Sequence, residues 1–202
     1  MAGTTVELDP EPPSPRRAAR RDELLADLVA LFLAEGFRAF GVGDLAARLH
    51  CSRSTLYLVA DSKERIVSTA VNRYFRECTR FVEEKVDAER DPARRITAYL
   101  LAVAEALAPA GPAFRADLAA HAGAREVYRR NTAAAAARVR SLVDDGVAAG
   151  ALRPVDAAFV GAAVARVMEG IQTGAVTEAS GLDDAHAYRA LADLVAHGLL
   201  ER

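Results

Sequence analysis

The residues best suited to chemistry in this sequence stand close together at positions 52–57. Arg53 is followed by Ser54, Thr55 and Tyr57, so one cation and three hydroxyl groups fall within two helical turns. Such donors bind phosphate oxygens and base edges, and an arginine can pair bidentately with guanine. Binding to nucleic acid is therefore the first hypothesis. The alternative is an ordinary pair of helices whose polar residues face water.

These donors need a helix to carry them, and the surrounding pattern predicts a helix-turn-helix. We expect a short helix over about 43–49, a tight turn at His50 and Cys51, and a second short helix from Ser52 to about residue 59. Ser52 is a good cap for that helix, because a serine hydroxyl accepts hydrogen bonds from the backbone at a helix start. The N-terminal residues of such a second helix reach the bases, which is where these donors stand.

The rest of the chain also reads as helical. Apolar residues recur with a period of 3.6, and Gly and Pro mark the boundaries. The first helix should end at Glu35, with Gly36 as its left-handed C′ residue. Asp61 or Ser62 should cap a long helix. Helices are then expected over about 64–86, 92–107, a short stretch with Phe114 and Leu118 before a break at Gly123, and about 124–149, 155–175 and 183–200. The sequence thus predicts an all-α protein of nine helices.

Composition and charge exclude several classes of protein. Hydrophobic residues make up 51% of the 202 residues, so the chain as a whole is not disordered. The net charge is −2, yet residues 14–80 carry 12 basic and 8 acidic residues, which gathers positive charge around the predicted helix-turn-helix. Two cysteines, Cys51 and Cys78, exclude a disulfide scaffold and favour a cytoplasmic protein. Neither a signal peptide nor a membrane span is recognisable.

No arrangement typical of an enzyme stands out. The four histidines have neither HxxxH nor HExxH spacing and no accompanying acidic cluster: His50, His121, His186 and His197. The sequence contains no nucleophile elbow, phosphate-binding loop or dinucleotide glycine pattern. We therefore expect no catalytic residue, no metal site and no cofactor.

The segment LFLAEGFRAFGVGDLAARLHCSRSTLYLVADSKERIV, at 31–67, resembles the N-terminal domain of TetR-type bacterial transcriptional regulators. The segments VDDGVAAGALRP (143–154) and GIQTGAV (170–176) resemble, more loosely, the family's entry into its last helices. The resemblance implies that Thr55, Tyr57 and Lys63 contact phosphates, while Arg53 and Ser54 face base edges, in a helix begun by Ser52. Four arginines before them, Arg16, Arg17, Arg20 and Arg21, form either a solvated run or a flexible arm that reaches DNA.

The sequence departs from the usual family pattern at three places. Phe40 and Gly41 replace hydroxyl residues, which predicts a weaker cap at the first helix of the pair. His50 replaces a glycine at a turn position that requires a positive φ angle, which His tolerates better than most residues. Ala60 replaces an aromatic residue, so the contact between helices there should be repacked.

The same resemblance implies a homodimer held by the last two helices, with an effector pocket among the middle helices. The residues expected at the dimer interface are Phe159, Val160, Ala163, Val164, Val167, Leu191, Leu194, Val195 and Leu199; the alternative is that they complete the core of a monomer. The candidate pocket residues, each of which also suits an ordinary core position, are Tyr99, Phe114, His121, Tyr128, Met168 and Gln172. Small residues dominate this region, which favours an apolar effector.

The domain organisation that follows has three parts. Residues 1–15 are expected to be a disordered tail and 16–64 a DNA-binding domain. Residues 65–202 form an effector-binding and dimerisation domain, in which helix 65–86 connects the two. The expected function is that of a cytoplasmic, ligand-responsive transcriptional regulator. More specifically, we expect a repressor that binds operator DNA and is released from it by a small molecule. The alternative is a protein of the same fold that binds a ligand or partner and has weak or lost operator binding.

Overall fold

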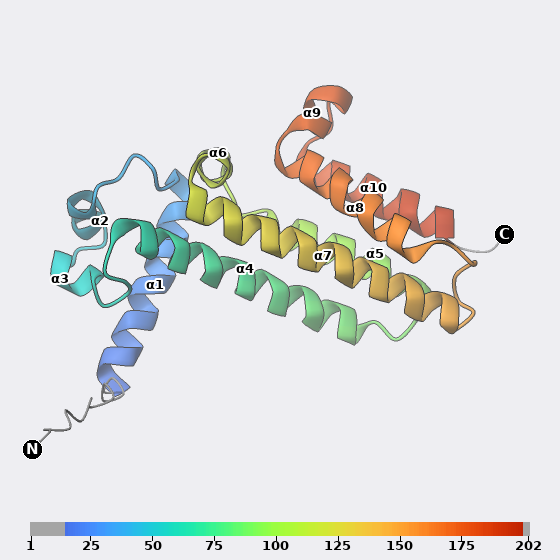
Figure 1. Ribbon diagram of the computed structural model, residues 1–202, viewed down its shortest axis with the longest axis horizontal. Coiled ribbons are helices and arrows are strands. Elements are labelled where there is room, and N and C mark those ends of the chain that lie inside the picture. The colour runs from blue at the N-terminus through green and yellow to red at the C-terminus, as the bar shows by residue number, and fades with distance from the viewer. Residues whose placement is uncertain (1–14, 200–202) are drawn as a thin grey trace, which may run out of the picture.

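The computed structural model describes residues 15–199, and this part of the chain is built from helices without a strand (Figure 1). Of the predicted tail, residues 1–15, the first 14 lie outside the described residues, as do 200–202, whereas Pro15 begins α1. The ten helices are α1 (Pro15–Glu35), α2 (Val42–Arg48), α3 (Arg53–Leu56), α4 (Lys63–Ala88), α5 (Pro92–Leu107), α6 (Pro112–Ala120), α7 (Ala122–Ala148), α8 (Ala157–Gln172), α9 (Ala175–Ser180) and α10 (Asp184–Leu199). The all-α prediction is confirmed.

Three details of the predicted helices were wrong. The second helix of the pair, α3, has 4 residues and ends earlier than expected. The break expected at Gly123 lies at His121, whose Nδ1 accepts a hydrogen bond from the Ala124 N–H and caps α7. The structure also contains a helix that was not predicted, α9. It is set off by Gly174 and Gly181, whose positive φ angles of 82° and 73° end α8 and α9.

Side chains at the predicted boundaries begin the long helices. Ser62, rather than Asp61, caps α4, and its Oγ accepts a hydrogen bond from the Arg65 N–H at 3.3 Å. Asp91 caps α5 just before a proline at its first position, which lacks the N–H that a helix start leaves unpaired. Local sequence therefore determines where these helices start.

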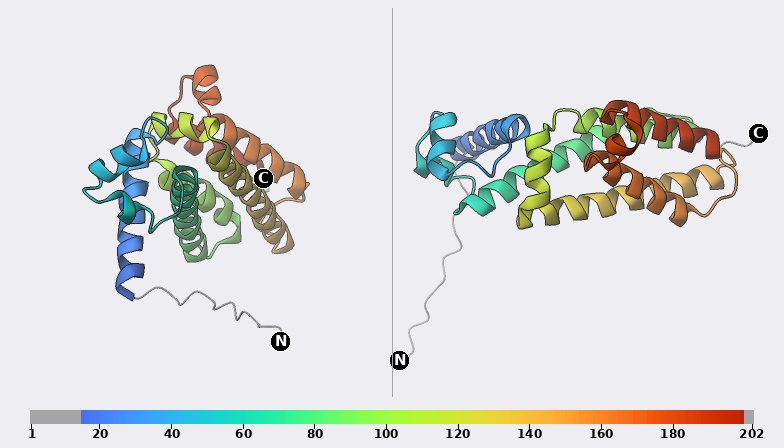
Figure 2. Two further views of the ribbon diagram at one scale, coloured as in Figure 1. Left: turned by 60° about the vertical axis from the view of Figure 1, so that its left-hand side comes forward. Right: turned by 90° about the horizontal axis from the view of Figure 1, so that it is seen from above.

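The helices form an elongated molecule with different elements at its two ends (Figure 2). At one end α1, α2 and α3 surround the start of α4, and at the other lie α8 and α10. The long helices α4, α5 and α7 run between the ends, while α6 lies across the region where the helix-turn-helix end meets these long helices.

No single helix in residues 15–199 is long and apolar enough to cross a membrane; α5 and α6 pass such a test only as a pair bent by 96°.

Two hydrophobic cores lie along α4. The first packs α1, α2 and α3 against the beginning of α4, with α6 and the start of α7. The second lies among α5, α8, α10 and the remaining parts of α4 and α7. One face of α4 contributes to both, from Ile66 in the first core to Val86 in the second. A single helix thus joins the helix-turn-helix end to the rest of the molecule.

Candidate nucleic-acid interface and interior cavity

The short helix α3 begins at a compact group of hydroxyls. Ser52 Oγ accepts the Thr55 N–H at 3.0 Å, as a helix cap does. The same oxygen lies 2.7 Å from Ser54 Oγ and 2.8 Å from Thr55 Oγ1. The cap predicted at Ser52 is therefore present, and it brings three hydroxyl groups to the start of α3.

The turn between α2 and α3 depends on a histidine in a left-handed conformation. His50 has a φ angle of 48° and is the one non-glycine residue among those described with a positive φ. The N–H of Cys51, the next residue, reaches back to the Ala46 carbonyl at 2.9 Å and closes the turn. The positive φ predicted for His50 is confirmed. Leu45 and Leu56, both fully buried, then hold α2 and α3 to the first core.

The donors predicted from the sequence are presented at the surface. Arg53, Ser54 and Tyr57 are exposed, Tyr57 to 47%, and Thr55 is half-buried. Arg53 reaches the first turn of α2, since its guanidinium would lie 2.9 Å from a Cβ atom placed on Gly43. Because Gly43 has no side chain, the Arg53 guanidinium can lie close to its backbone.

Lys63 supplies a second cation at the same end of the molecule (Figure 1). It is the first residue of α4, where the N-terminal end of the helix dipole also favours an anion. Its Nζ donates to the Arg38 carbonyl at 3.2 Å and forms no ion pair within residues 15–199. Arg53 likewise has no ion-pair partner there, whereas Arg65 is paired with Asp61 at 2.6 Å. Among the described residues, Arg53 and Lys63 thus carry positive charges that no carboxylate pairs at this end of the molecule.

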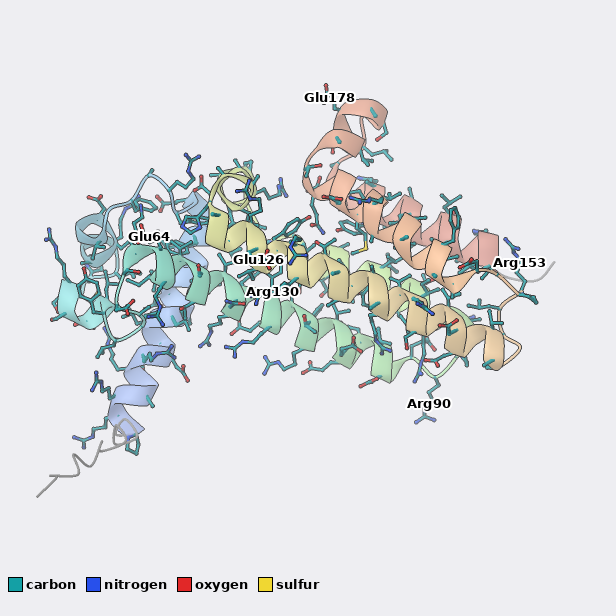
Figure 3. The ribbon with its side chains drawn as sticks, in the orientation of Figure 1. Glu64, Arg90, Glu126, Arg130, Arg153 and Glu178 are labelled. Atoms are coloured by element: carbon teal, nitrogen blue, oxygen red, sulfur yellow. The ribbon has the colours of Figure 1, made fainter. Side chains whose placement is uncertain are left out.

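Three other arginines, Arg90, Arg130 and Arg153, lie away from this surface (Figure 3). Arg90 projects at the end of α4 opposite to α3, and Arg153 lies at the turn between α7 and α8 (Figure 3). Glu126 and Arg130 lie on the side of α7. The positive charge relevant to α3 is therefore local to that end of the molecule.

The sites at which the sequence departs from the family pattern are structurally accommodated. Gly41 precedes α2 without a side-chain cap, and its N–H donates to Asp44 Oδ2 at 2.7 Å. Phe40 is half-buried, with the Arg48 guanidinium 5.6 Å from its ring centroid. Ala60 packs, partly buried, on the first core. Half of a capping box thus remains at the start of α2, as expected for a weak glycine cap.

The four arginines near the N-terminus belong to helix α1, so the flexible-arm hypothesis was wrong for them. Arg16 and Arg17 are exposed on its first turn, and Arg20 is paired with Glu23 at 3.2 Å. Arg21 is half-buried and reaches the Val59 carbonyl at 3.4 Å. These residues extend the positive surface from a helix rather than from a mobile strand of chain.

Helix α6 attaches the helix-turn-helix end to the rest of the protein. Asp117 Oδ2 accepts hydrogen bonds from the Phe37 N–H at 2.6 Å and the Arg38 N–H at 2.8 Å. Gly36, with φ at 78°, makes room for that carboxylate, because a Cβ atom there would lie 2.6 Å from it. Gly111, before α6, donates to the Leu33 carbonyl at 2.9 Å. Sequence reasoning did not single out Asp117; its role depends on a contact 80 residues away.

Two of the candidate pocket residues lie at this junction and not at a cavity, which corrects the expectation for them. Phe114 packs with its ring centroid 5.9 Å from that of Phe37. His121 lies 5.6 Å from the same phenylalanine ring and caps α7. Both side chains are committed to the first core and to a helix start.

A cavity of about 200 Å³ lies instead between α4, α5, α7 and α8. Three predicted residues line it: Tyr99, Met168 and Gln172. Glu83, Asn131 and Arg138 also line it and were not predicted. Asn131 and Arg138 share one face of α7 with Thr132 and Ala135, so polar residues recurring at helical spacing within an alanine-rich helix were the available signal.

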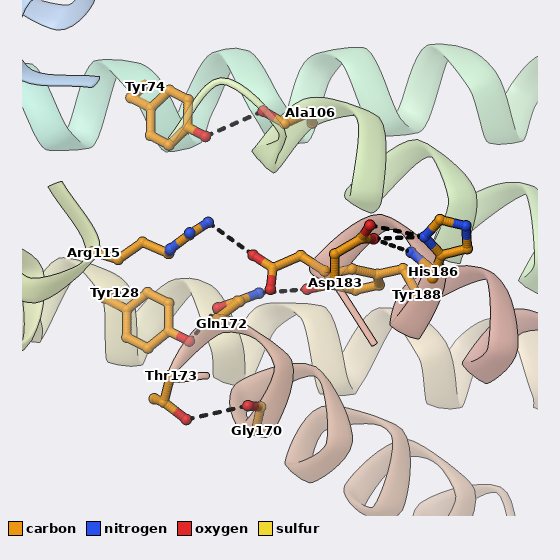
Figure 4. A network of polar contacts seen from close by, with 11 residues as sticks. Tyr74, Ala106, Arg115, Tyr128, Gly170, Gln172, Thr173, Asp183, His186 and Tyr188 are labelled. Atoms are coloured by element: carbon orange, nitrogen blue, oxygen red, sulfur yellow. Dashed lines mark hydrogen bonds and ion pairs between the residues drawn. The ribbon is translucent and has the colours of Figure 1, made fainter. Parts of the chain in front are cut away.

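Gln172, which lines the cavity, is the middle of a chain of polar side chains (Figure 4). Gln172 accepts a hydrogen bond from the Tyr128 hydroxyl through its oxygen and donates to the Tyr188 hydroxyl through its nitrogen at 2.7 Å. Tyr128 itself does not line the cavity. Nearby, the Arg115 guanidinium donates to Asp184 at 2.8 Å and connects α6 with the start of α10.

The predicted dimer residues differ in how deeply they are buried within the chain. Val164, Leu191, Val195 and Leu199 are buried in the second core of the chain itself, so the structure corrects their assignment to an interface. Val160 is half-buried. Phe159, at 71% exposure, and Leu194, at 70%, face outward, as do Ala163 and Val167.

Comparisons with known proteins agree with this arrangement. Residues 24–70 match the family model for bacterial regulatory proteins of the tetR family. A transcriptional regulator from Saccharomonospora viridis, solved in complex with choline, superposes with a TM-score of 0.74 at 17% identity, covering 92% of this chain and 100% of that one. No protein of curated function matches the sequence significantly.

Two further solved structures have the same fold. A TetR transcriptional regulator from Chloroflexus aurantiacus gives a TM-score of 0.73 at 22% identity, with 93% of this chain and 99% of that chain covered. A TetR transcription regulator from Haloarcula marismortui gives 0.74 at 16% identity, with 91% and 100% covered. The sequence of residues 24–70 thus matches the tetR family of bacterial regulatory proteins, and the described residues as a whole have the fold of these solved regulators.

Proposed function

We propose that the protein is a cytoplasmic, homodimeric regulator without catalytic activity that binds operator DNA and is released from it by a small molecule, most simply as a repressor. The observation that carries the proposal is the surface of α3: Arg53, Ser54 and Tyr57 are exposed, and at the same end of the molecule the Lys63 ammonium has no ion-pair partner among residues 15–199. Arg53 and Ser54 are assigned to base edges, and Thr55, Tyr57 and Lys63 to phosphates. Ser52 holds the start of the helix.

The experiment that tests operator binding uses the promoter region beside the protein's own gene, titrated across salt concentration. Specific binding should weaken steeply with salt, since each phosphate contact releases counterions. Tyr57→Ala and Lys63→Ala should weaken it, while Arg90→Ala, a matched loss of a surface side chain at the far end, should not. Equally weak binding to every duplex would contradict a sequence-specific regulator.

The dimer is proposed to form through the outward faces of α8 and α10. Large exposed apolar side chains occur there, and small residues around them permit close approach. A two-fold dimer fits a palindromic operator with half-sites about 34–36 Å apart. In light-scattering measurements Phe159→Glu and Leu194→Glu should give monomers. Leu101→Glu, at a leucine on α5 that is 41% exposed, is the control and should remain dimeric.

Communication between the cavity and α3 is proposed to run through α6. The polar chain at Gln172 adjoins the cavity, Arg115 ties α6 to α10, and Asp117 holds the backbone between α1 and α2. A ligand that moves α6 would therefore move the attachment of the helix-turn-helix. The coupling free energy would be about 1–3 kcal/mol if it is of the usual size.

One observation favours a second function, a protein of this fold that binds a ligand or partner but no operator. The start of α2 lacks a hydroxyl side chain at Phe40 and Gly41, so one backbone cap and one donor to phosphate are absent there. The salt titration separates the two functions, since this alternative predicts the absence of any specific site.

A further inference from the structure

The wall of the cavity is mainly apolar and contains a single aromatic ring. Small and aliphatic side chains from four helices form most of it, and Tyr99 is the aromatic residue. Quaternary ammonium ligands are held by cages of several aromatic faces. The cavity therefore lacks the surroundings that such a cation requires.

Most polar groups of the wall are already paired within the protein. Thr79 Oγ1 donates to the Phe75 carbonyl at 2.9 Å, and Thr132 Oγ1 donates to the Tyr128 carbonyl at 3.1 Å. The amide of Gln172 is engaged on both sides by tyrosine hydroxyls. None of these groups needs a ligand to complete its hydrogen bonding.

Two polar groups differ from the rest. Within residues 15–199, neither the Tyr99 hydroxyl nor the Asn131 side-chain amide has a hydrogen-bond partner, and neither is among the fully enclosed unpaired atoms. Tyr99 as a residue is only 5% exposed, so the accessible part of its side chain opens into the cavity that it lines. A hydroxyl and an amide are thus left for a ligand to satisfy, and together they can both donate and accept.

The charges at the cavity cancel each other. Arg138 binds Glu83 bidentately, with Nε–Oε1 at 2.9 Å and Nη2–Oε2 at 2.7 Å. This pair is partly exposed at the wall and is strengthened by its geometry. Burial raises the pKa of the Cys78 thiol to about 11, so that group is neutral at physiological pH. A charged ligand would enter a low-dielectric site and compete with an ion pair already formed.

The volume limits the size of the ligand. A dry cavity of about 150 Å³ in another protein holds benzene. The present cavity measures about 200 Å³. By proportion to benzene, with its six non-hydrogen atoms, it accommodates a molecule of roughly eight non-hydrogen atoms.

We propose that the cavity binds an uncharged, largely apolar small molecule of this size that carries one hydroxyl or amide group, which Tyr99 and Asn131 hold. The proposal deepens the proposed function and rests on it for the regulatory meaning of binding, but binding itself is measured without DNA. Because ligand binding and operator binding are measured separately, a failure of one still allows the other to be interpreted.

The test compares ligands of matched size and different charge by titration calorimetry on the full chain. The four compounds are 4-ethylphenol, 4-methylbenzamide, 4-methylbenzoate and phenyltrimethylammonium. We expect the first two to bind at least tenfold more tightly than the anion and the cation. Tighter binding of either ion would overturn the proposed ligand class, and so would the absence of binding by all four at millimolar concentration.

Two variants place the binding in this cavity. Tyr99→Phe removes only the hydroxyl and should weaken the preferred compound roughly tenfold, the effect of one lost hydrogen bond. Ala135→Phe adds a ring to the cavity wall and should abolish binding. Ala137→Phe, on the exposed side of the same helix, is the matched control and should bind as the wild type does. Unchanged binding by Ala135→Phe would place the site elsewhere and overturn the proposal.

A mobility shift without ligand then separates this proposal from the proposed function. A protein that binds its operator but none of the four compounds contradicts only the ligand class. A protein that binds the neutral compounds but no specific duplex retains the ligand site and contradicts the regulator.

Discussion

Both hydrophobic cores of this protein are rich in leucine, valine and alanine, but the first contains five buried aromatic residues and the second two. The first is linked by aromatic rings, for example Phe32 to Phe37 at 5.5 Å, and Tyr74 to Phe114 at 5.6 Å. The second consists mainly of valine, leucine and alanine and adjoins a cavity of about 200 Å³. Large rings fill the space where helices of different directions meet, whereas small side chains on long helices leave a gap.

This difference fits two different tasks. A surface that reads DNA requires its donors in fixed positions, and a filled core beneath α3 supplies that rigidity. A site that accepts a ligand requires space and groups that are not yet paired. The same chain achieves both by changing the size of its core residues along α4.

The largest expected effect tests the contrast between the cores directly. Phe114→Ala should lower the free energy of unfolding by about 3–5 kcal/mol, because it removes a ring enclosed on every side. Met168→Ala should lower it by about 2 kcal/mol, near the lower end for such changes, because one side of Met168 already faces the cavity. Urea denaturation measures both. Equal losses would mean that the second core is packed as tightly as the first.

The next effect concerns the attachment between the two regions. Asp117→Ala should reduce stability by about 2 kcal/mol, since it leaves the N–H groups of Phe37 and Arg38 without their charged acceptor. Asp117→Asn should fall between this variant and the wild type. Glu105→Ala, at an exposed carboxylate on α5, serves as the control. If both Asp117 variants unfold as the wild type does, α6 does not hold the loop.

A smaller change sharpens what the surface of α3 contributes. Arg53→Lys keeps the charge but loses the planar fork that pairs with guanine, so specific binding should weaken by about 1–3 kcal/mol. Binding to unrelated duplexes should be nearly unchanged. Competition mobility shifts measure the ratio. An equal loss on both kinds of DNA would assign Arg53 to phosphates.

The smallest effect lies beside the cavity and appears only at alkaline pH. Burial raises the pKa of Cys78 from 9.0 to about 11. Below pH 9 the folded and unfolded states both hold this proton, and between 9 and 11 only the folded state does, so stability declines as the pH rises. Cys78→Val should remove roughly 1 kcal/mol of that decline by pH 10. Denaturation at pH 8 and pH 10 measures the decline in the free energy of unfolding. Cys51→Val, at a less buried thiol, should reduce that decline less.

The sequence predicted those features that depend on neighbours along the chain. The periodic apolar rows gave the long helices, Ser52 gave the cap of α3, and the turn required the positive φ found at His50. Such local features are determined within a few residues, which is why they can be inferred from one sequence.

Features that depend on distant contacts were not predictable in the same way. Periodicity shows that Phe114 is buried but not which core buries it, and it was wrongly placed at the cavity. Asp117 gains its role only when α6 meets the loop after α1. Leu191 and Leu194 belong to one apolar helix, yet one is 5% and the other 70% exposed, which only the packed structure distinguishes.

The length of α4 has a mechanical consequence. Its residue Glu83 lies at the cavity, and its first residue, Lys63, lies at the helix-turn-helix end of the molecule (Figure 1). The helical distance between them is about 30 Å, at about 1.5 Å per residue. Tilting this rod by roughly 6° about the cavity would carry its other end about 3 Å, close to the rise of one base pair (about 3.4 Å). A lever of this length turns a displacement too small to disturb a core into a mismatch of one step along the double helix.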